Sequence, residues 1–287
     1  MDKTILKKKL VLGSVNFTQK YGVNPKQIKL SEIKKIFSLA KKKNVMIIDT
    51  AESYITKNNI FKNLNKKFQL ITKIIPSSKW TSLSYCEERI KNHIKKYNNL
   101  KIKTLLFHDT KILFTKNGPK IFNNLEILKK KKFFSQIGIS IYNIKELDYI
   151  IPKYDIKVVQ CPYNLLDKRV INSGWYSKLK KRKIEIHVRS IFLKGLLVNE
   201  KIYKKLYFRR WNKQFSEWFK FLKKSNISAI DYCLSDLLTY DFDKIIIGIN
   251  NCDHLIKIFN FKLIKSKSKI FNNKVNSIKL VDPRKWN

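Results

Sequence analysis

Glycine is scarce in this sequence. There are seven glycines in 287 residues, and no two of them lie within five positions of each other. Rossmann folds and P-loop proteins hold phosphates in glycine-rich turns, GxGxxG or GxxxxGK[ST], and neither motif occurs here. The usual phosphate-binding loop of an open α/β sheet is therefore excluded.

Cysteine and histidine are also sparse, with four of each. They are dispersed along the chain, at Cys86, Cys161, Cys233, Cys252, His93, His108, His187 and His254. No CxxC or HxxxH spacing is present, so the sequence predicts neither a metal site nor a disulfide framework.

Long apolar stretches are missing too. No run reaches the 18 residues that indicate a transmembrane helix, and the N-terminus has no apolar signal region. We therefore expect a cytoplasmic protein with no membrane partner.

Acidic residues are few: 21 Asp and Glu stand against 62 Lys and Arg, a formal net charge of +41. Such an excess can indicate binding to nucleic acid or to an anionic membrane. However, only seven of the basic residues are arginine, the side chain best suited to reading phosphates and bases. The lysines are spread along the whole chain, which favours a solvated basic surface and no specific nucleic-acid partner. Electrostatic binding to nucleic acid or membrane stays open as an alternative.

The sequence does contain a regular alternation of short β-branched apolar runs with longer amphipathic, lysine-rich runs. Eight strands are expected at residues 9–15, 45–49, 68–74, 104–107, 136–139, 157–161, 184–188 and 244–248. Helices are expected at residues 31–43, 83–97, 119–130, 144–151, 228–238 and 251–261, with an additional excursion before residue 228. Eight strands that alternate with helices predict an α/β protein, a closed (β/α)₈ TIM barrel, as one domain over residues 1–287.

Four polar residues lie at or just past the ends of the second, third and fourth predicted strands. They are Asp49, Tyr54, Lys73 and His108. In a parallel barrel these strand ends meet on one face, where active sites lie. Each residue also has an ordinary structural explanation, such as a helix cap, a rim aromatic or a surface lysine, so their common placement carries the hypothesis.

These four side chains suit the reduction of a carbonyl group. An adjacent ammonium favours the phenolate form of a tyrosine, a carboxylate can hold the ammonium, and a histidine can orient a carbonyl oxygen. Because no side chain supplies a hydride, such a reaction requires a nicotinamide cofactor.

The sequence resembles the aldo-keto reductase family over nearly its whole length. The segments that carry the resemblance are 12–17 (LGSVNF), 19–22 (QKYG), 49–54 (DTAESY), 72–73 (TK), 105–109 (LLFHD), 137–142 (IGISIY), 159–164 (VQCPYN), 189–197 (RSIFLKGLL) and 247–250 (IGIN). The resemblance implies a (β/α)₈ barrel that uses NADPH or NADH without a Rossmann motif. It assigns Tyr54 as the proton donor, Lys73 as its activating ammonium, Asp49 as the partner of Lys73, and His108 as the residue that orients the substrate carbonyl.

The resemblance also implies a set of cofactor-binding residues. Ser140 and Gln160 match positions that hold the nicotinamide carboxamide. Arg189 and Ser190 follow the seventh strand, and Gly248 and Asn250 follow the eighth. We expect NADPH as cofactor, with NADH as an alternative.

The sequence departs from the family pattern at three places. Ile141 stands where many members have an asparagine after Ser140. Arg189 stands where an aromatic residue often stacks on the nicotinamide; it could stack, bind an anionic group or form a structural ion pair. Residues 250–254 lack the Lys/Ser…Arg set that reads the adenosine 2′-phosphate.

The sequence therefore predicts an NAD(P)H-dependent oxidoreductase that acts on a small-molecule aldehyde or ketone. The alternative is a catalytically inactive barrel that binds a nicotinamide nucleotide and serves as a regulatory or interaction subunit. The physiological substrate and the oligomeric state are left open.

Overall fold

The computed structural model describes residues 3–18, 28–54, 60–62, 64–264, 271 and 277–286 of the chain. Its centre is a closed barrel of eight parallel strands in chain order, in which β8 pairs back to β1. The strands are β1 (Leu10–Gly13), β2 (Ile47–Asp49), β3 (Gln69–Ile74), β4 (Lys101–Phe107), β5 (Phe134–Ser140), β6 (Val158–Pro162), β7 (Glu185–Arg189) and β8 (Lys244–Gly248). The predicted (β/α)₈ TIM barrel is confirmed, whereas a single domain over all 287 residues stays a prediction.

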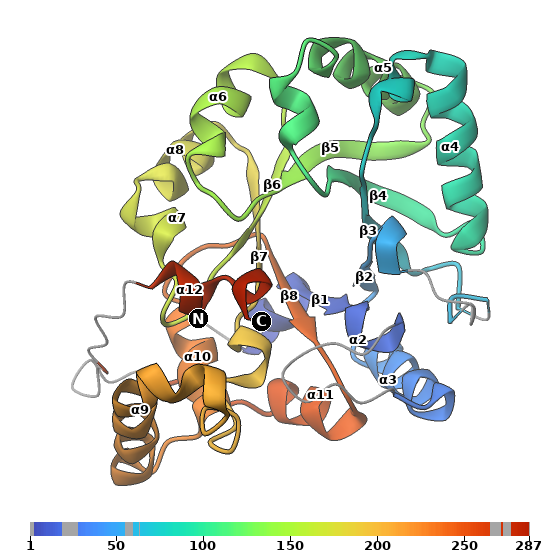
Figure 1. Cartoon of the computed structure of the whole chain (residues 1–287). Coiled ribbons are helices and arrows are strands. Elements are labelled where there is room, and N and C mark those ends of the chain that lie inside the picture. The colour runs from blue at the N-terminus through green and yellow to red at the C-terminus, as the bar shows by residue number, and fades with distance from the viewer. Residues whose placement is uncertain are drawn as a thin grey trace.

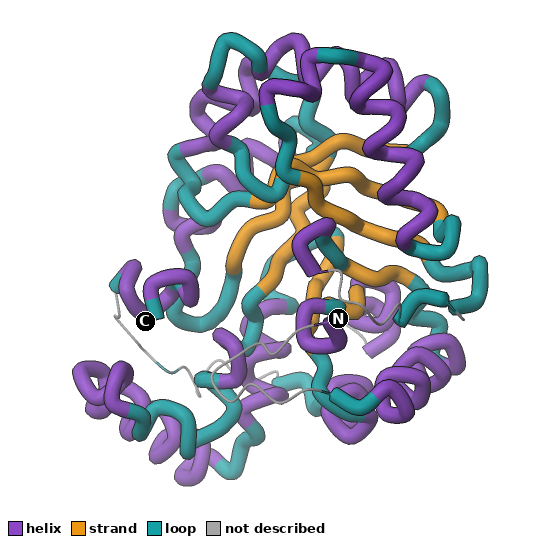
Figure 2. Tube along the Cα trace, turned by 45° about the vertical axis from the view of Figure 1, so that its right-hand side comes forward, coloured by secondary structure: helices purple, strands orange, loops and turns teal. Residues whose placement is uncertain are grey.

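Helices surround the barrel, as Figures 1 and 2 show from two directions. The α-helices are α1 (Lys3–Lys9), α2 (Val15–Thr18), α3 (Leu30–Lys42), α4 (Leu83–Lys96), α5 (Gly118–Lys130), α6 (Glu146–Lys153), α7 (Arg169–Asn172), α8 (Trp175–Lys181), α9 (Asn212–Ser225), α10 (Ala229–Leu237), α11 (Cys252–Phe259) and α12 (Ile278–Val281). Short 3₁₀ turns are η1 (Glu52–Tyr54), η2 (Ser78–Thr81), η3 (Lys111–Phe114), η4 (Leu193–Gly195), η5 (Leu206–Trp211) and η6 (Pro283–Lys285).

All eight predicted strands are present, but some of their bounds differ from the prediction. β4 begins at Lys101 instead of Thr104, and β5 covers Phe134–Ser140 instead of residues 136–139. Two lysines interrupt the apolar pattern at the start of β4, yet the backbone pairing continues there, with Lys101 opposite Gln69. Strand pairing is made by backbone hydrogen bonds, so a charged, exposed side chain at the first residue of a strand does not prevent pairing there.

The helices form where one face of the segment is apolar, and three of them also begin at a side-chain cap. In α3, residues Ile33, Ile36, Phe37 and Ala40 are buried on one face. The side chains of Ser82, Ser228 and Asn251 accept hydrogen bonds from backbone N–H groups in the first turns of α4, α10 and α11, and this satisfies donors that the helix itself leaves unpaired.

The barrel interior is partly aliphatic and partly polar. Its apolar layer consists of Val11, Ile71, Leu106, Val158 and Ile246, which form one buried cluster. A Cβ on Gly138 would lie 2.3 Å from the carbonyl oxygen of Val158, so only glycine allows β5 and β6 to approach this closely.

The barrel interior also contains a chain of hydrogen-bonded polar side chains, nearer the amino ends of the strands than the apolar layer. Glu185 accepts a hydrogen bond from Gln136 Nε2 at 2.8 Å, and its other carboxylate oxygen lies 2.9 Å from His187 Nε2. Gln136 in turn accepts a hydrogen bond from Thr104 at 3.0 Å. These bonds satisfy groups that would otherwise be costly to bury.

The connection between β7 and β8 is long, as predicted, and it carries η4, η5, α9 and α10. Its aromatic side chains form a second hydrophobic cluster that also includes Leu280 and Val281 near the C-terminus. The C-terminal residues are thereby held against the β7–β8 excursion. Within the described ranges, no helix has the length and apolar character needed to cross a membrane.

Candidate active site

Asp49 and Lys73 form a buried ion pair at the carboxyl ends of two neighbouring strands. Lys73 Nζ lies 2.6 Å from Asp49 Oδ1 and donates a second hydrogen bond to the carbonyl oxygen of Thr50 at 3.1 Å. The Lys73 side chain is only 2% exposed and that of Asp49 only 7%. Burial lowers the pKa of Lys73, and the carboxylate of Asp49 opposes this effect. The pair therefore places a hydrogen-bonded ammonium inside the barrel mouth.

Tyr54 is the last residue of η1, the turn that follows β2 in the chain. The turn is closed by a hydrogen bond from Tyr54 N to the carbonyl oxygen of Ala51 at 2.9 Å. Lys73 Nζ lies 5.5 Å from the centre of the Tyr54 ring. The Tyr54 side chain is half-buried, so part of it remains accessible beside the ammonium.

His108 follows β4 and faces Tyr54. Its ring packs edge-to-face on the Tyr54 ring, with centroids 5.9 Å apart. Burial, and secondly the charge of Lys73, lower the pKa of His108 to about 4. The imidazole is therefore neutral at physiological pH. Its Nδ1 is buried and has no hydrogen-bond partner among the described residues.

Ser140 and Gln160 complete one wall of the site. Gln160 Nε2 donates a hydrogen bond to Asp49 Oδ2 at 2.7 Å, and Ser140 Oγ donates one to Gln160 Oε1 at 3.3 Å. Both residues are buried. A polar chain thus runs from β5 through β6 to the carboxylate on β2.

Arg189 ends β7 beside these groups. Its charge contributes to the lowered pKa values of Lys73 and His108. Its Nη2 donates a hydrogen bond to the carbonyl oxygen of Ile141 at 2.9 Å, and its guanidinium lies on the ring of Tyr142. Ser190 has a positive φ of 63°, and its carbonyl oxygen accepts hydrogen bonds from Asn164 and Leu193.

Gly248 ends β8 and Asn250 follows it; only β1 lies between this strand and β2, which ends at Asp49. Asn250 accepts a hydrogen bond from Asn16 Nδ2, and a Cβ on Gly248 would lie 3.3 Å from the same nitrogen. The side-chain oxygen of Asn16 is buried and has no partner among the described residues. These residues therefore mark a second polar area of the rim. The predicted segment 19–22 lies outside the described residues.

Sequence reasoning missed Arg284, which lies beside Arg189. Arg284 follows α12, and its guanidinium lies on the ring of Tyr142. The one available signal was the scarcity of arginine in a lysine-rich chain, because nothing in the local sequence connects residue 284 with residue 142.

The residues present fit a nicotinamide group. A carboxamide has one acceptor oxygen and an NH₂ donor. The Ser140 hydroxyl donates to the Gln160 carbonyl oxygen at 3.3 Å, and these two groups become the complementary donor and acceptor when that bond opens. The unpartnered oxygen of Asn16 offers a further acceptor at the rim. No Lys or Arg occurs between Gly248 and His254, so this segment contains no cation for an adenosine 2′-phosphate.

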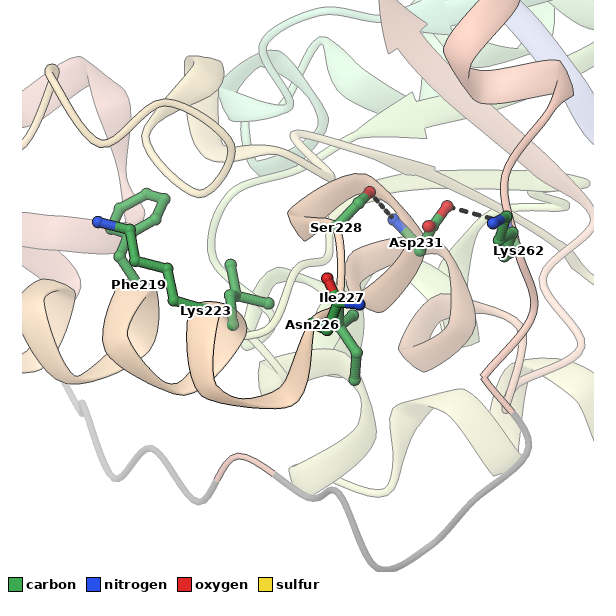
Figure 3. A pocket seen from close by; sticks show the side chains of 8 residues that line it. Phe219, Lys223, Asn226, Ile227, Ser228, Asp231 and Lys262 are labelled. Carbon is green, nitrogen blue, oxygen red and sulfur yellow. Dashed lines mark hydrogen bonds between the residues drawn. The ribbon is translucent and has the colours of Figure 1, made fainter.

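Within the part of the chain that the structure describes, other features do not form competing sites. The described residues contain no cluster of His, Cys, Asp and Glu that could hold a metal ion, and all four cysteines are free. A pocket of about 500 Å³ lies between the end of α9 and the start of α10 (Figure 3). Two of its polar side chains belong to local structure, since Ser228 caps α10 and Asp231 accepts a hydrogen bond from the backbone of Lys262.

The fold and the site together define a parallel barrel in which Asp49, Lys73, Tyr54 and His108 gather at the carboxyl ends of the strands. Among solved structures, an aldo-keto reductase from Bacillus halodurans in its holo form is similar, with a TM-score of 0.70 and 15% identity over 91% of this chain and 89% of that one. A glycerol dehydrogenase from Gluconobacter oxydans has a TM-score of 0.67 and 14% identity over 91% and 88%. At these identities the likeness establishes the fold alone.

The sequence comparison identifies the family. The Aldo/keto reductase family matches residues 9–276, and the chain belongs to this family. A search of curated proteins gave no significant match. Family membership supports an oxidoreductase that acts on carbonyl groups, in a family that generally uses nicotinamide cofactors.

Proposed function

We propose that this protein is an NAD(P)H-dependent reductase that converts an aldehyde or ketone to an alcohol. The observation that carries the proposal is the position of Tyr54, whose ring lies 5.5 Å from Lys73 Nζ and 5.9 Å from the His108 ring. A phenol between an ammonium and a neutral imidazole is suited to giving a proton to a carbonyl oxygen.

Each of the four residues has a separate task in this proposal. Tyr54 donates its hydroxyl proton to the substrate oxygen as negative charge develops there. Lys73 stabilises the phenolate that remains, and Asp49 holds the ammonium in place. His108 is neutral, so it can donate one hydrogen bond to the substrate oxygen without repelling Lys73.

The cofactor supplies the hydride when it is bound. Ser140 and Gln160 would hold its carboxamide, Arg189 and Ser190 would line the adjoining wall, and Gly248 and Asn250 would contact its nucleotide portion. NADPH is the proposed cofactor, with NADH as an alternative. The partner is a small-molecule carbonyl compound, and the proposal includes no specific nucleic acid or membrane.

The variant Tyr54→Phe tests the proposal, because it removes the proton donor and keeps the ring. We expect kcat for a carbonyl panel to fall about 10²- to 10⁴-fold, the usual contribution of a general acid. The Kd for NADPH, measured by nucleotide fluorescence, is expected to stay within about threefold of the wild-type value, since no hydride or proton moves on binding. Tyr85→Phe, on the outer helix α4, serves as the matched control.

The alternative of an inactive nucleotide-binding barrel gives different results. It requires that wild-type protein bind NADPH but turn over no member of a broad aldehyde and ketone panel. Equal kcat values for wild type and Tyr54→Phe would also contradict the assigned proton donor.

A further inference from the structure

Two arginines from distant parts of the chain share one tyrosine ring at the barrel mouth. The guanidinium carbon of Arg189 lies 3.9 Å from the centre of the Tyr142 ring, and that of Arg284 lies 3.7 Å from it. Since both lie against the same ring, the two guanidinium carbons are at most about 7.6 Å apart. Figure 1 shows α12 and the chain end near β7, which ends at Arg189.

Tyr142 is a fixed platform for these arginines. Its carbonyl oxygen accepts a hydrogen bond from Arg169 Nη1 at 2.9 Å. Arg169 itself is held by the buried carboxylate of Asp167 through two bonds of 2.7 Å. Since Asp167 neutralises Arg169, this part of the platform is balanced in charge.

The second carboxylate near the platform belongs to Asp282, and it is committed to Arg284. Arg284 donates to it from Nε at 2.9 Å and from Nη2 at 2.6 Å. The Asp282 side chain is 3% exposed, whereas that of Arg284 is 60% exposed. Asp282 therefore holds the Nε and Nη2 edge of the Arg284 guanidinium. Nη1 of Arg284 forms no hydrogen bond to any described residue.

Arg189 is not neutralised. Among the described residues it forms no ion pair, and the one acceptor for its five N–H donors is the carbonyl oxygen of Ile141. Glu146 acts electrostatically on Arg284, but its carboxylate already accepts hydrogen bonds from Thr110 and from the backbone of Asn143. The three arginines and three carboxylates around Tyr142 balance in total charge, but the guanidinium of Arg189 forms no ion pair with a described residue and lies close enough to Lys73 and His108 to lower their pKa values.

We propose that Arg189 and Arg284 form an anion subsite, so that the substrate is a carbonyl compound that carries a carboxylate or a phosphate. This inference rests on the proposed reductase function. Planar guanidiniums bind carboxylates and phosphates through paired hydrogen bonds. Arg284 would act as a specificity residue that is delivered by the C-terminal segment.

The alternative occupant of the two arginines is a phosphate of the cofactor. It predicts that loss of Arg284 raises the Kd for NADPH and affects all carbonyl substrates equally. An anion subsite for the substrate predicts that only charged substrates are affected and that nucleotide binding is unchanged.

Pairs of substrates that differ in one charge separate these outcomes. Para-formylbenzoate is compared with the isosteric para-formylbenzamide, and glyceraldehyde phosphate with glyceraldehyde. For Arg284→Gln, we expect kcat/KM for the anionic member to fall about 10- to 100-fold relative to its neutral twin, the loss of one or two charge-assisted hydrogen bonds. Arg284→Lys keeps the charge but not the fork, so it should recover part of this loss.

Two controls test whether a change in the charged-to-neutral ratio comes from a general structural effect of the substitution. Arg210→Gln removes an arginine that stacks on Tyr207 and Trp211 and should leave the charged-to-neutral ratio unchanged. Arg284→Gln leaves Asp282 buried without its partner, so the double variant Asp282→Asn/Arg284→Gln, which has no unpaired carboxylate, is measured as well. Both variants should give the same low ratio.

Failure of this inference is distinguishable from failure of the reductase function. Turnover that depends on Tyr54 but shows equal kcat/KM for both members of each pair, or an equal loss of both in Arg284→Gln, overturns the anion subsite and keeps the reductase. If no aldehyde is turned over, the subsite is tested by binding alone. The protein saturated with NADP⁺ is titrated in a calorimeter with para-(hydroxymethyl)benzoate and, separately, with its amide, and the two Kd values are compared. Equal affinities for the acid and the amide would overturn it.

Discussion

Gln160 donates a hydrogen bond of 2.7 Å to Asp49 across the barrel, although 111 residues separate the two in sequence. The other oxygen of the same carboxylate accepts the Lys73 ammonium. Both oxygens of Asp49 are thus fixed by the protein before any ligand enters. An ammonium that is held in this way needs no rearrangement when charge develops on the neighbouring phenol, which is the condition for electrostatic preorganisation.

The Asp49–Lys73 pair should dominate local stability as well as activity. Lys73→Met leaves a buried carboxylate without its counter-ion, and we expect the free energy of unfolding to fall by about 3–5 kcal/mol. Urea unfolding measures this loss. Lys67→Met, an exposed lysine just before β3, should change stability by less than about 0.5 kcal/mol.

The double variant Asp49→Asn/Lys73→Met separates the two roles of the pair. Removing both charges should recover at least half of the lost stability, because no unpaired ion stays buried. Carbonyl turnover should remain lost, since the ammonium is absent. Recovery of turnover without recovery of stability would contradict the roles given to these residues.

Stability should decrease as pH falls from about 6.5 toward 4. His93 is buried, with Nε2 2.9 Å from Thr72 Oγ1, and burial lowers its pKa to about 4, with smaller contributions from Lys96 and Arg89. The unfolded chain binds the proton first, near pH 6.5, so protonation favours unfolding in this window. At pH 5 this costs about 2 kcal/mol of unfolding free energy for His93.

The variant His93→Gln tests this dependence, because its Nε2 can still reach Thr72 but does not titrate. Unfolding free energies in urea are compared at about pH 7.5 and about pH 5. The loss between the two pH values should be smaller in the variant by about 2 kcal/mol, whereas contributions from other groups cancel. An identical loss in both proteins would show that His93 does not titrate in this window.

Discrimination between the two nicotinamide cofactors should be weak. The segment from Gly248 to His254 contains Asp253 but no Lys or Arg, so it offers no cation to an adenosine 2′-phosphate. We expect kcat/KM values for NADPH and NADH within about tenfold of each other, or about 1.4 kcal/mol. Initial rates at saturating aldehyde, followed by nicotinamide absorbance, give the ratio. A preference for NADPH above a hundredfold would place its phosphate against other residues.

Local sequence was informative where a property repeats along the chain. The eight strands were predicted because buried parallel strands are apolar on both faces, and the amphipathic helices because one face of each is buried. The bounds were less accurate, as in β4, because the first residues of a strand are held by backbone pairing even when Lys101 is exposed. The polar interior formed by Gln136, Glu185 and His187 had no local signal.

By itself, the sequence determined the barrel and the positions of Asp49, Tyr54, Lys73 and His108 at strand ends, because strand order places such ends on one face. Only the tertiary structure decided which groups meet there. It closed Gln160 onto Asp49 and brought Arg284 from the chain end to Tyr142, next to Arg189. The physical reason is that periodicity is a property of neighbouring residues, whereas these contacts depend on closure of the barrel and on the docking of the C-terminal segment against the β7–β8 excursion.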